Sequence, residues 1–131
     1  MTHKPDGYST LSHYLIVRDA QACLRFGANV FGAARLRVIP REDGGGIMHA
    51  EMRIEDTVIM MGEMPEAGDA HVHIYVADAE AAFARACAAG GTVVQPLLRQ
   101  GDGDYRGGVS DGNGTTWWIA QMETYPPDGM A

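Results

Sequence analysis

The chain has 131 residues, of which 46% are hydrophobic and 21% charged, so it suits one globular domain and not a disordered segment. The formal net charge of -7 argues against nucleic acid or a membrane surface as a partner, because both attract basic proteins. No apolar run approaches the ~20 residues that a membrane span requires, and we expect a cytoplasmic protein.

The first half of the chain predicts one strand, one helix and three further strands. An alternating run over residues 11–17 comes before Asp19, whose side chain can accept from the first N–H groups of a helix. Apolar residues at helical spacing follow, and Gly32 is expected to end the helix. Three runs typical of strands, separated by turn residues, lie at 35–39, 47–54 and 57–61.

The second half repeats this pattern after a joint at residues 63–70. Val17-Arg18-Asp19-Ala20 matches Val76-Ala77-Asp78-Ala79, with a strand expected at 71–76 and a helix after Asp78. Strand patterns return at 92–98, 106–110 and 115–121. We therefore predict an α+β fold in one domain over residues 1–131, made of two tandem βαβββ modules at about 10–62 and 71–122. The modules should form a curved mixed sheet with a concave cleft and with the helices on the convex face.

Several short motifs in this order resemble the vicinal oxygen chelate superfamily, which includes glyoxalase I, extradiol dioxygenases and bleomycin-resistance proteins. The resemblance is to its PhnB-like branch, and it rests on residues 14–19, 30–33, 48–51, 107–111 and 114–120. Gly27 and Gly112 depart from the branch, which usually has Tyr and Pro at these two places. The resemblance implies the tandem fold and a homodimer, with a cleft built within one chain or across two swapped chains.

The metal-dependent members of this superfamily hold a divalent ion with one side chain from the first and one from the fourth strand of each module. Here those places fall on Ser12, Met60, His71 and Trp118. Only His71 is a good ligand for such an ion, and an indole N–H cannot coordinate at all. We expect no metal and no other cofactor. A new site built from His49, Glu51, His71 and His73 is the minority alternative.

Side-chain alternation along the strands predicts which residues face the concave cleft. The predicted wall mixes aromatic rings and Met side chains with a few polar groups, a composition that suits a small organic ligand. Arg106 and Asp104 lie beside a Gly-rich loop, and we expect them at the mouth of the cleft. The predicted ligand-binding residues are Ser12, Tyr14, His49, Glu51, Arg53, Met60, His71, His73, Tyr75, Arg106 and Trp118.

Our leading hypothesis is a small-molecule binding protein that holds an aromatic ligand without metal. The alternative is a glyoxalase-like lyase, isomerase or dioxygenase that uses an improvised metal site or a Glu51/His71 acid-base pair. Glu51 and His71 are the candidate catalytic residues, and the sequence does not assign a catalytic role to either. A third possibility is an interaction module whose cleft has no physiological ligand.

Overall fold

Each half of the chain folds into one βαβββ module, as expected from the sequence. The structure, a computed structural model, describes residues 3–99 and 101–124. The first module contains β1 (Tyr14–Val17), α1 (Ala20–Phe31), β2 (Ala34–Pro40), β3 (Ile47–Ile54) and β4 (Thr57–Glu63). The second contains β5 (Ala70–Tyr75), α2 (Ala79–Ala88), β6 (Thr92–Arg99), β7 (Asp104–Ser110) and β8 (Thr115–Met122). The α+β fold with two tandem modules is confirmed.

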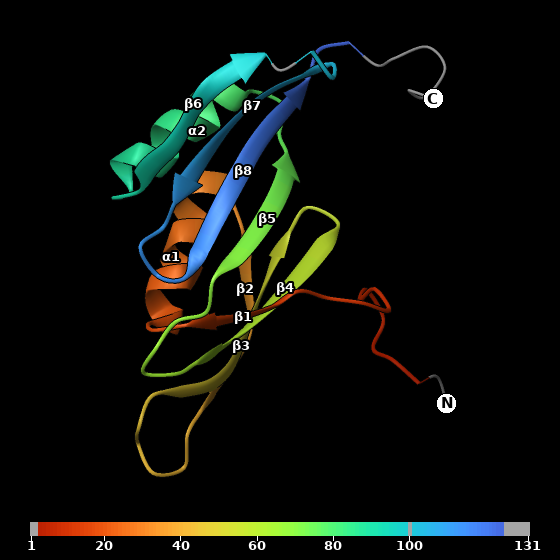
Figure 1. Cartoon of the computed structure of the whole chain (residues 1–131). Helices are drawn as coiled ribbons and strands as arrows, with labels where there is room; N and C mark the ends of the chain where they lie inside the picture. Colours follow the sequence, from red (N-terminus) through yellow and green to blue (C-terminus); the bar gives the residue numbers. More distant parts are fainter. Residues whose placement is uncertain (1–2, 100, 125–131) are drawn as a thin grey trace.

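Each module builds its own four-stranded sheet, in the orders β1-β4-β3-β2 and β5-β8-β7-β6. The first strand of each module runs parallel to the last, with Tyr14 opposite Met60 and His73 opposite Trp118. The helices α1 and α2 contact each other and lie together against the sheets (Figure 1). Among the described residues no strand ladder joins the two sheets. Neither described helix is long and apolar enough to cross a membrane.

Both helices begin where the sequence predicts. The carboxylate of Asp19 accepts from the N–H of Ala22 at 3.0 Å, and that of Asp78 accepts from the N–H of Ala81 at 3.1 Å. These bonds satisfy N–H groups that have no partner within a helix. Gly32 then ends α1 in the left-handed conformation, at φ 70°. The two copies of the sequence repeat therefore share the aspartate that caps the start of each helix.

The two departures from the PhnB-like branch have structural explanations. A Cβ atom at position 27 would overlap the sulfur of Met52 on β3, so Gly27 lets α1 approach the sheet closely. The Met52 side chain fills the space that a larger residue in α1 would need. Gly112 has a φ of 70°, which proline cannot adopt because its ring fixes φ near −65°.

Glu63 belongs to β4 and not to the joint that the sequence predicts at residues 63–70, which corrects that boundary. Its carboxylate accepts from the N–H of Ala20 at 2.7 Å and from the N–H of Ile47 at 2.8 Å. One side chain thus joins the start of α1 to the start of β3. In the second module the Gln121 side chain accepts from the N–H of Ala79 at 2.9 Å, an equivalent bond to the start of α2.

We predict that Glu63→Ala lowers the free energy of unfolding by about 1–2 kcal/mol, because it leaves two backbone donors without their acceptor. Urea denaturation followed by circular dichroism measures this. Glu66→Ala, at an exposed position three residues away, is the control and should change stability by less than about 0.5 kcal/mol. Equal effects of the two substitutions would contradict the assigned role of Glu63.

Candidate ligand-binding faces of the two sheets

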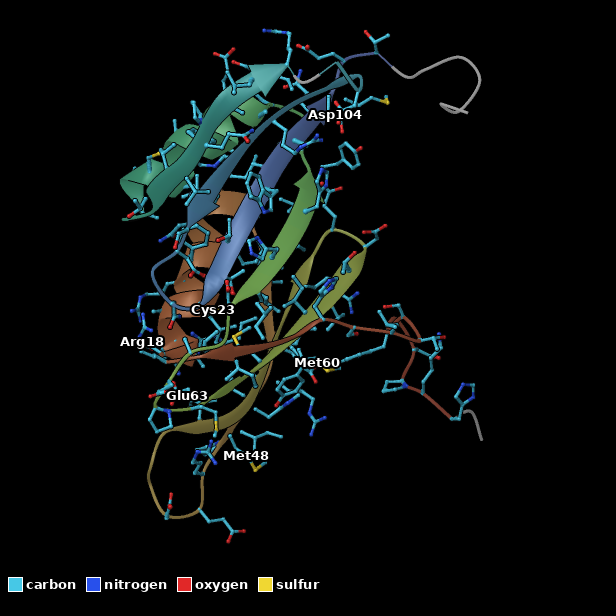
Figure 2. The ribbon with its side chains drawn as sticks, viewed as in Figure 1. Arg18, Cys23, Met48, Met60, Glu63 and Asp104 are labelled. Atoms are coloured by element: carbon cyan, nitrogen blue, oxygen red, sulfur yellow. The ribbon has the colours of Figure 1, made fainter. Side chains whose placement is uncertain are left out.

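The predicted site residues lie on strands whose side chains alternate between the helix-packed core and the opposite face. On β1, Leu15 and Val17 are buried while Tyr14 and Ile16 are exposed. On β8, Trp117 is fully buried and Trp118 only partly. The strand register on which the predicted wall depends is therefore present. Figure 2 shows Met60 in the first module and Asp104 in the second, at separate places in the molecule.

On the first sheet, a chain of hydrogen bonds runs from β1 to β3. The hydroxyl of Tyr14 lies 3.1 Å from His49 Nδ1, and His49 Nε2 lies 2.8 Å from Glu51 Oε2. Glu51 is only 1% exposed, and its other carboxylate oxygen accepts a short hydrogen bond from the Tyr8 hydroxyl. Three of the predicted site residues thus form one network, in which the carboxylate is the buried centre.

The environment of Glu51 keeps its carboxylate ionised. Burial by itself opposes ionisation, but the hydrogen bonds from His49 and Tyr8 outweigh it, and the pKa of Glu51 is lowered below its ordinary value. The same hydrogen bond to Glu51 raises the pKa of the Tyr8 hydroxyl. The network therefore holds a negative charge at Glu51 and a protonated phenol at Tyr8.

Tyr8 is a site residue that sequence reasoning missed. It precedes the first strand pattern, in a segment with no periodicity that would place it on a sheet. Arg53 holds this segment in position by donating to the carbonyl oxygen of Gly7 at 3.0 Å. Arg53, predicted as a ligand contact, is thus engaged with the chain's own N-terminal arm, residues 3–13. No sequence signal pairs this arm with β3.

On the second sheet, Trp118 and His71 form a hydrogen-bonded pair of nearly parallel rings. The indole Nε1 of Trp118 donates to His71 Nδ1 at 3.0 Å, with the ring centroids 6.2 Å apart and nearly parallel. The six-membered ring of Trp118 lies against Gly108 of β7, where any Cβ would overlap it. Trp118 is thus fixed in orientation from both sides, and its flat ring is available as a stacking surface.

A cluster of hydrogen-bonded polar side chains lies further along this sheet. Tyr75 donates to Asp104 Oδ2 at 2.8 Å, and Arg106 donates to the same oxygen at 2.9 Å and also to Asp102. Burial and the neighbouring Arg106 lower the pKa of His73, whose Nε2 lies 3.4 Å from the guanidinium. Because two aspartates neutralise Arg106, it is not a free cation for binding an anionic ligand.

The structure does not bring Glu51 and His71 into contact. Glu51 is bonded to Tyr8 and His49 on the first sheet, while His71 is bonded to Trp118 and lies 3.7 Å from Asp69 on the second. The acid-base pair considered from the sequence would need the two faces to be brought together. Within residues 3–99 and 101–124, no hydrogen bond or ion pair connects them.

The four places at which the superfamily holds a metal do not fit one here. The donor chemistry is a hydroxyl, a thioether, an indole and one imidazole, and the Nδ1 of that imidazole, His71, already accepts from Trp118. In the described part of the chain, no three or more His, Cys, Asp or Glu residues are grouped so that they could hold an ion. The residues at these four places therefore do not form a ligand set for a divalent ion.

A groove of about 580 Å³ lies between the two modules. It includes His73 and Tyr75 of the predicted wall, Val72 and Ile74 from the helix-facing side of β5, and residues 54–57 around the turn between β3 and β4. Its position shows that the space between the modules is open along β5. The lining residues are His13, Phe31, Ile54, Glu55, Asp56, Thr57, Ile59, Val72, His73, Ile74, Tyr75, Val76 and Trp117.

Comparison with known proteins agrees with this architecture. Residues 10–119 match the model of the Glyoxalase/Bleomycin resistance protein/Dioxygenase superfamily. An uncharacterised protein of Mycobacterium bovis is 34% identical over 125 residues, which cover 85% of this chain and 82% of that protein.

Solved structures with the same fold include TioX from Micromonospora sp. ML1, with a TM-score of 0.73 at 25% identity over 87% of this chain and 98% of that one. The fosfomycin resistance protein FosX of Listeria monocytogenes has a TM-score of 0.73 at 17% identity, covering 94% and 98% of the two chains. A PhnB protein of Bacillus cereus has a TM-score of 0.66 at 16% identity, covering 86% and 99%.

Proposed function

The chain belongs to the Glyoxalase/Bleomycin resistance protein/Dioxygenase superfamily, and within it we propose a small-molecule binding protein that holds an aromatic ligand without a metal ion. The observation that carries this proposal is the oriented pair of Trp118 and His71. A rigid indole over Gly108 offers a flat surface for an aromatic ring. Tyr14 and Met60, opposite each other on the first sheet, supply a second apolar surface that can adapt to the ligand.

We propose that the protein is a homodimer in which the first sheet of one subunit faces the second sheet of the other. Two observations support this arrangement. The two sets of predicted ligand-binding residues lie on separate sheets of one chain, and β5 pairs only with β8 among the described strands, which leaves its other edge open. Sedimentation equilibrium should give twice the chain mass of 14.1 kDa, and a monomer at micromolar concentration would contradict the assembly.

The reducing cytoplasm remains our proposal for the location. Cys87 is an exposed free thiol and Cys23 a buried one, and burial raises the pKa of Cys23 to about 12. Exposed free thiols persist where the environment is reducing.

We predict that Trp118→Ala weakens binding of an aromatic probe about tenfold, because it removes a stacking surface worth about 1–1.5 kcal/mol. The measurement is a fluorescence titration with 1-anilinonaphthalene-8-sulfonate, in buffer with and without EDTA. Met64→Ala serves as the control, because Met64 is exposed and lies in the predicted joint at residues 63–70, away from the proposed binding residues. Unchanged affinity in the Trp118 variant would reject the proposed binding surface, and loss of binding in EDTA would reject its independence from metal.

The second candidate function is an enzyme that uses acid-base chemistry, a lyase or isomerase, and one observation favours it. The buried, ionised Glu51 orients His49, an arrangement that enzymes use to activate an imidazole as a base. Glu51 is bonded to His49, which is in turn bonded to Tyr14, and not to the His71 considered from the sequence. Catalysed disappearance of a ligand, lost in His49→Gln, would favour the enzyme over simple binding.

A further inference from the structure

Tyr14, His49 and Glu51 have the connectivity of a nucleophile, a base and a group that orients the base. Tyr14 Oη lies 3.1 Å from His49 Nδ1, and the other ring nitrogen of His49 lies 2.8 Å from Glu51 Oε2. Such a chain, in which the base is fixed by a third group, is the geometric signature of an activated nucleophile. It is built across β1 and β3 and needs no residue from the second module.

The donor and acceptor roles follow from the chemistry of Glu51. An ionised carboxylate can only accept hydrogen bonds, so His49 Nε2 must carry the hydrogen that it shares with Glu51. In the neutral imidazole, Nδ1 is then the acceptor, and the Tyr14 hydroxyl must donate to it. A proton leaving Tyr14 therefore has a base in place, and the resulting imidazolium would be paired with a carboxylate that is 1% exposed.

The tyrosines in contact with carboxylates lack this arrangement. Tyr75 donates to Asp104, and this hydrogen bond raises the pKa of Tyr75. Tyr8 donates directly to Glu51. An imidazole is about a hundredfold stronger base than a carboxylate, so of these three phenols only that of Tyr14 faces a partner suited to take its proton. Tyr14 is 48% exposed and Tyr75 58%, so a small reagent reaches both side chains.

We propose that Tyr14 is a nucleophile that accepts acyl groups from activated aryl esters, with His49 as its base and Glu51 as the positioning residue. The Tyr14 oxygen forms a bond to the acyl carbon while the bond to the leaving phenol breaks. The proton of Tyr14 passes to His49 Nδ1 and from there to the departing phenolate. Water then cleaves the acyl-tyrosine, which releases the carboxylic acid and restores the hydroxyl of Tyr14.

This inference deepens the proposed function, because it assigns a ligand class to part of the same binding face. The test uses 4-nitrophenyl acetate, which is small enough to react without the Trp118 surface. Release of 4-nitrophenolate gives the overall rate, and peptide mass mapping of the quenched protein gives the rate of acetylation at each tyrosine. Tyr75 is the internal reference within the same molecule.

We expect Tyr14 to be acetylated at least about tenfold faster than Tyr75, below the 10²–10⁴-fold that a positioned base can contribute. His49→Gln keeps a polar side chain but removes the base, and should bring the rate at Tyr14 down to that at Tyr75. Glu51→Gln should give an intermediate rate, and Tyr14→Phe should remove the fast acetylation. An unchanged rate at Tyr75 in each variant shows that the fold is intact.

Equal rates at Tyr14 and Tyr75 in the natural protein would overturn the proposal, and this comparison needs no variant. So would equally fast acetylation at a tyrosine other than Tyr14, or a Tyr14 rate that His49→Gln leaves unchanged. The acetylation of Tyr14 and the binding of 1-anilinonaphthalene-8-sulfonate are both measured on the natural protein, so that either property can be absent while the other is present. Loss of one property without the other thus separates a failure of this inference from a failure of the proposed function.

Discussion

Trp117→Ala is expected to lower the free energy of unfolding by about 3–5 kcal/mol, the usual range for deleting a large aromatic side chain from a core. Trp117 is 0% exposed, and its ring packs against Phe26 at 5.9 Å and Phe31 at 5.2 Å between centroids. Its indole Nε1 also donates to Asp111 at 3.1 Å, so the substitution leaves that carboxylate without one partner. Such a loss is a large part of the stability of an ordinary domain.

The neighbouring tryptophan provides the control for this prediction. Trp118 lies on the opposite face of the same strand and is partly exposed, so Trp118→Ala should cost less than half as much stability while it weakens ligand binding. Guanidinium denaturation of both variants, followed by tyrosine fluorescence and far-ultraviolet circular dichroism, measures the difference. If Trp118→Ala were as destabilising as Trp117→Ala, the assignment of one residue to the core and the other to the binding face would be wrong.

The fold could be predicted from the sequence because its signals are local. Strand alternation around Trp117 separates core from surface within a few residues, and Asp19 and Asp78 mark both helix starts by a short-range hydrogen bond. The strand boundaries differ from the predicted ones by up to a few residues. The strand β4 continues to Glu63, which pairs with Val17, and β7 begins at Asp104, which pairs with Met122, and neither pairing can be read from the local sequence.

The candidate site could be predicted only as a set of residues and not as a set of contacts. Alternation places Tyr14, His49 and Glu51 on one face, but it gives no information on which side chains bond to one another. The partner of Glu51 that completes the network is Tyr8, 43 positions away in a segment without periodicity. The grouping of His71 with Trp118 rather than with Glu51 likewise depends on how the two sheets are placed, which no local pattern encodes.

Asn113→Ala is expected to weaken the polar contacts between the two modules. The side-chain oxygen of Asn113 accepts from the N–H groups of Arg18 at 2.9 Å and Asp19 at 3.0 Å, and its Nδ2 donates to the carbonyl oxygen of Asp19 at 2.7 Å. Asn113 is 7% exposed and belongs to the turn before β8, so these three bonds fasten the second module to the start of α1 in the first. Alanine would leave two donors without partners and remove one of the two hydrogen bonds to the carbonyl oxygen of Asp19, which keeps the bond from the N–H of Cys23, at a cost of about 2–4 kcal/mol.

Asn113→Asp separates the contribution of the two bonds that Asn113 accepts from that of the bond that it donates. A carboxylate can still accept from Arg18 and Asp19, but it cannot donate to the carbonyl oxygen of Asp19, so its loss of stability should lie between those of the natural protein and Asn113→Ala. Ser110→Ala, which removes only an exposed bond to the N–H of Gly112, should change stability by less than about 0.5 kcal/mol. Urea denaturation of the three variants gives the order. A stability of Asn113→Ala within error of Ser110→Ala would mean that the Asn113 bonds contribute nothing measurable and that apolar contacts, such as those of Trp117 with Phe26 and Phe31, hold the modules together.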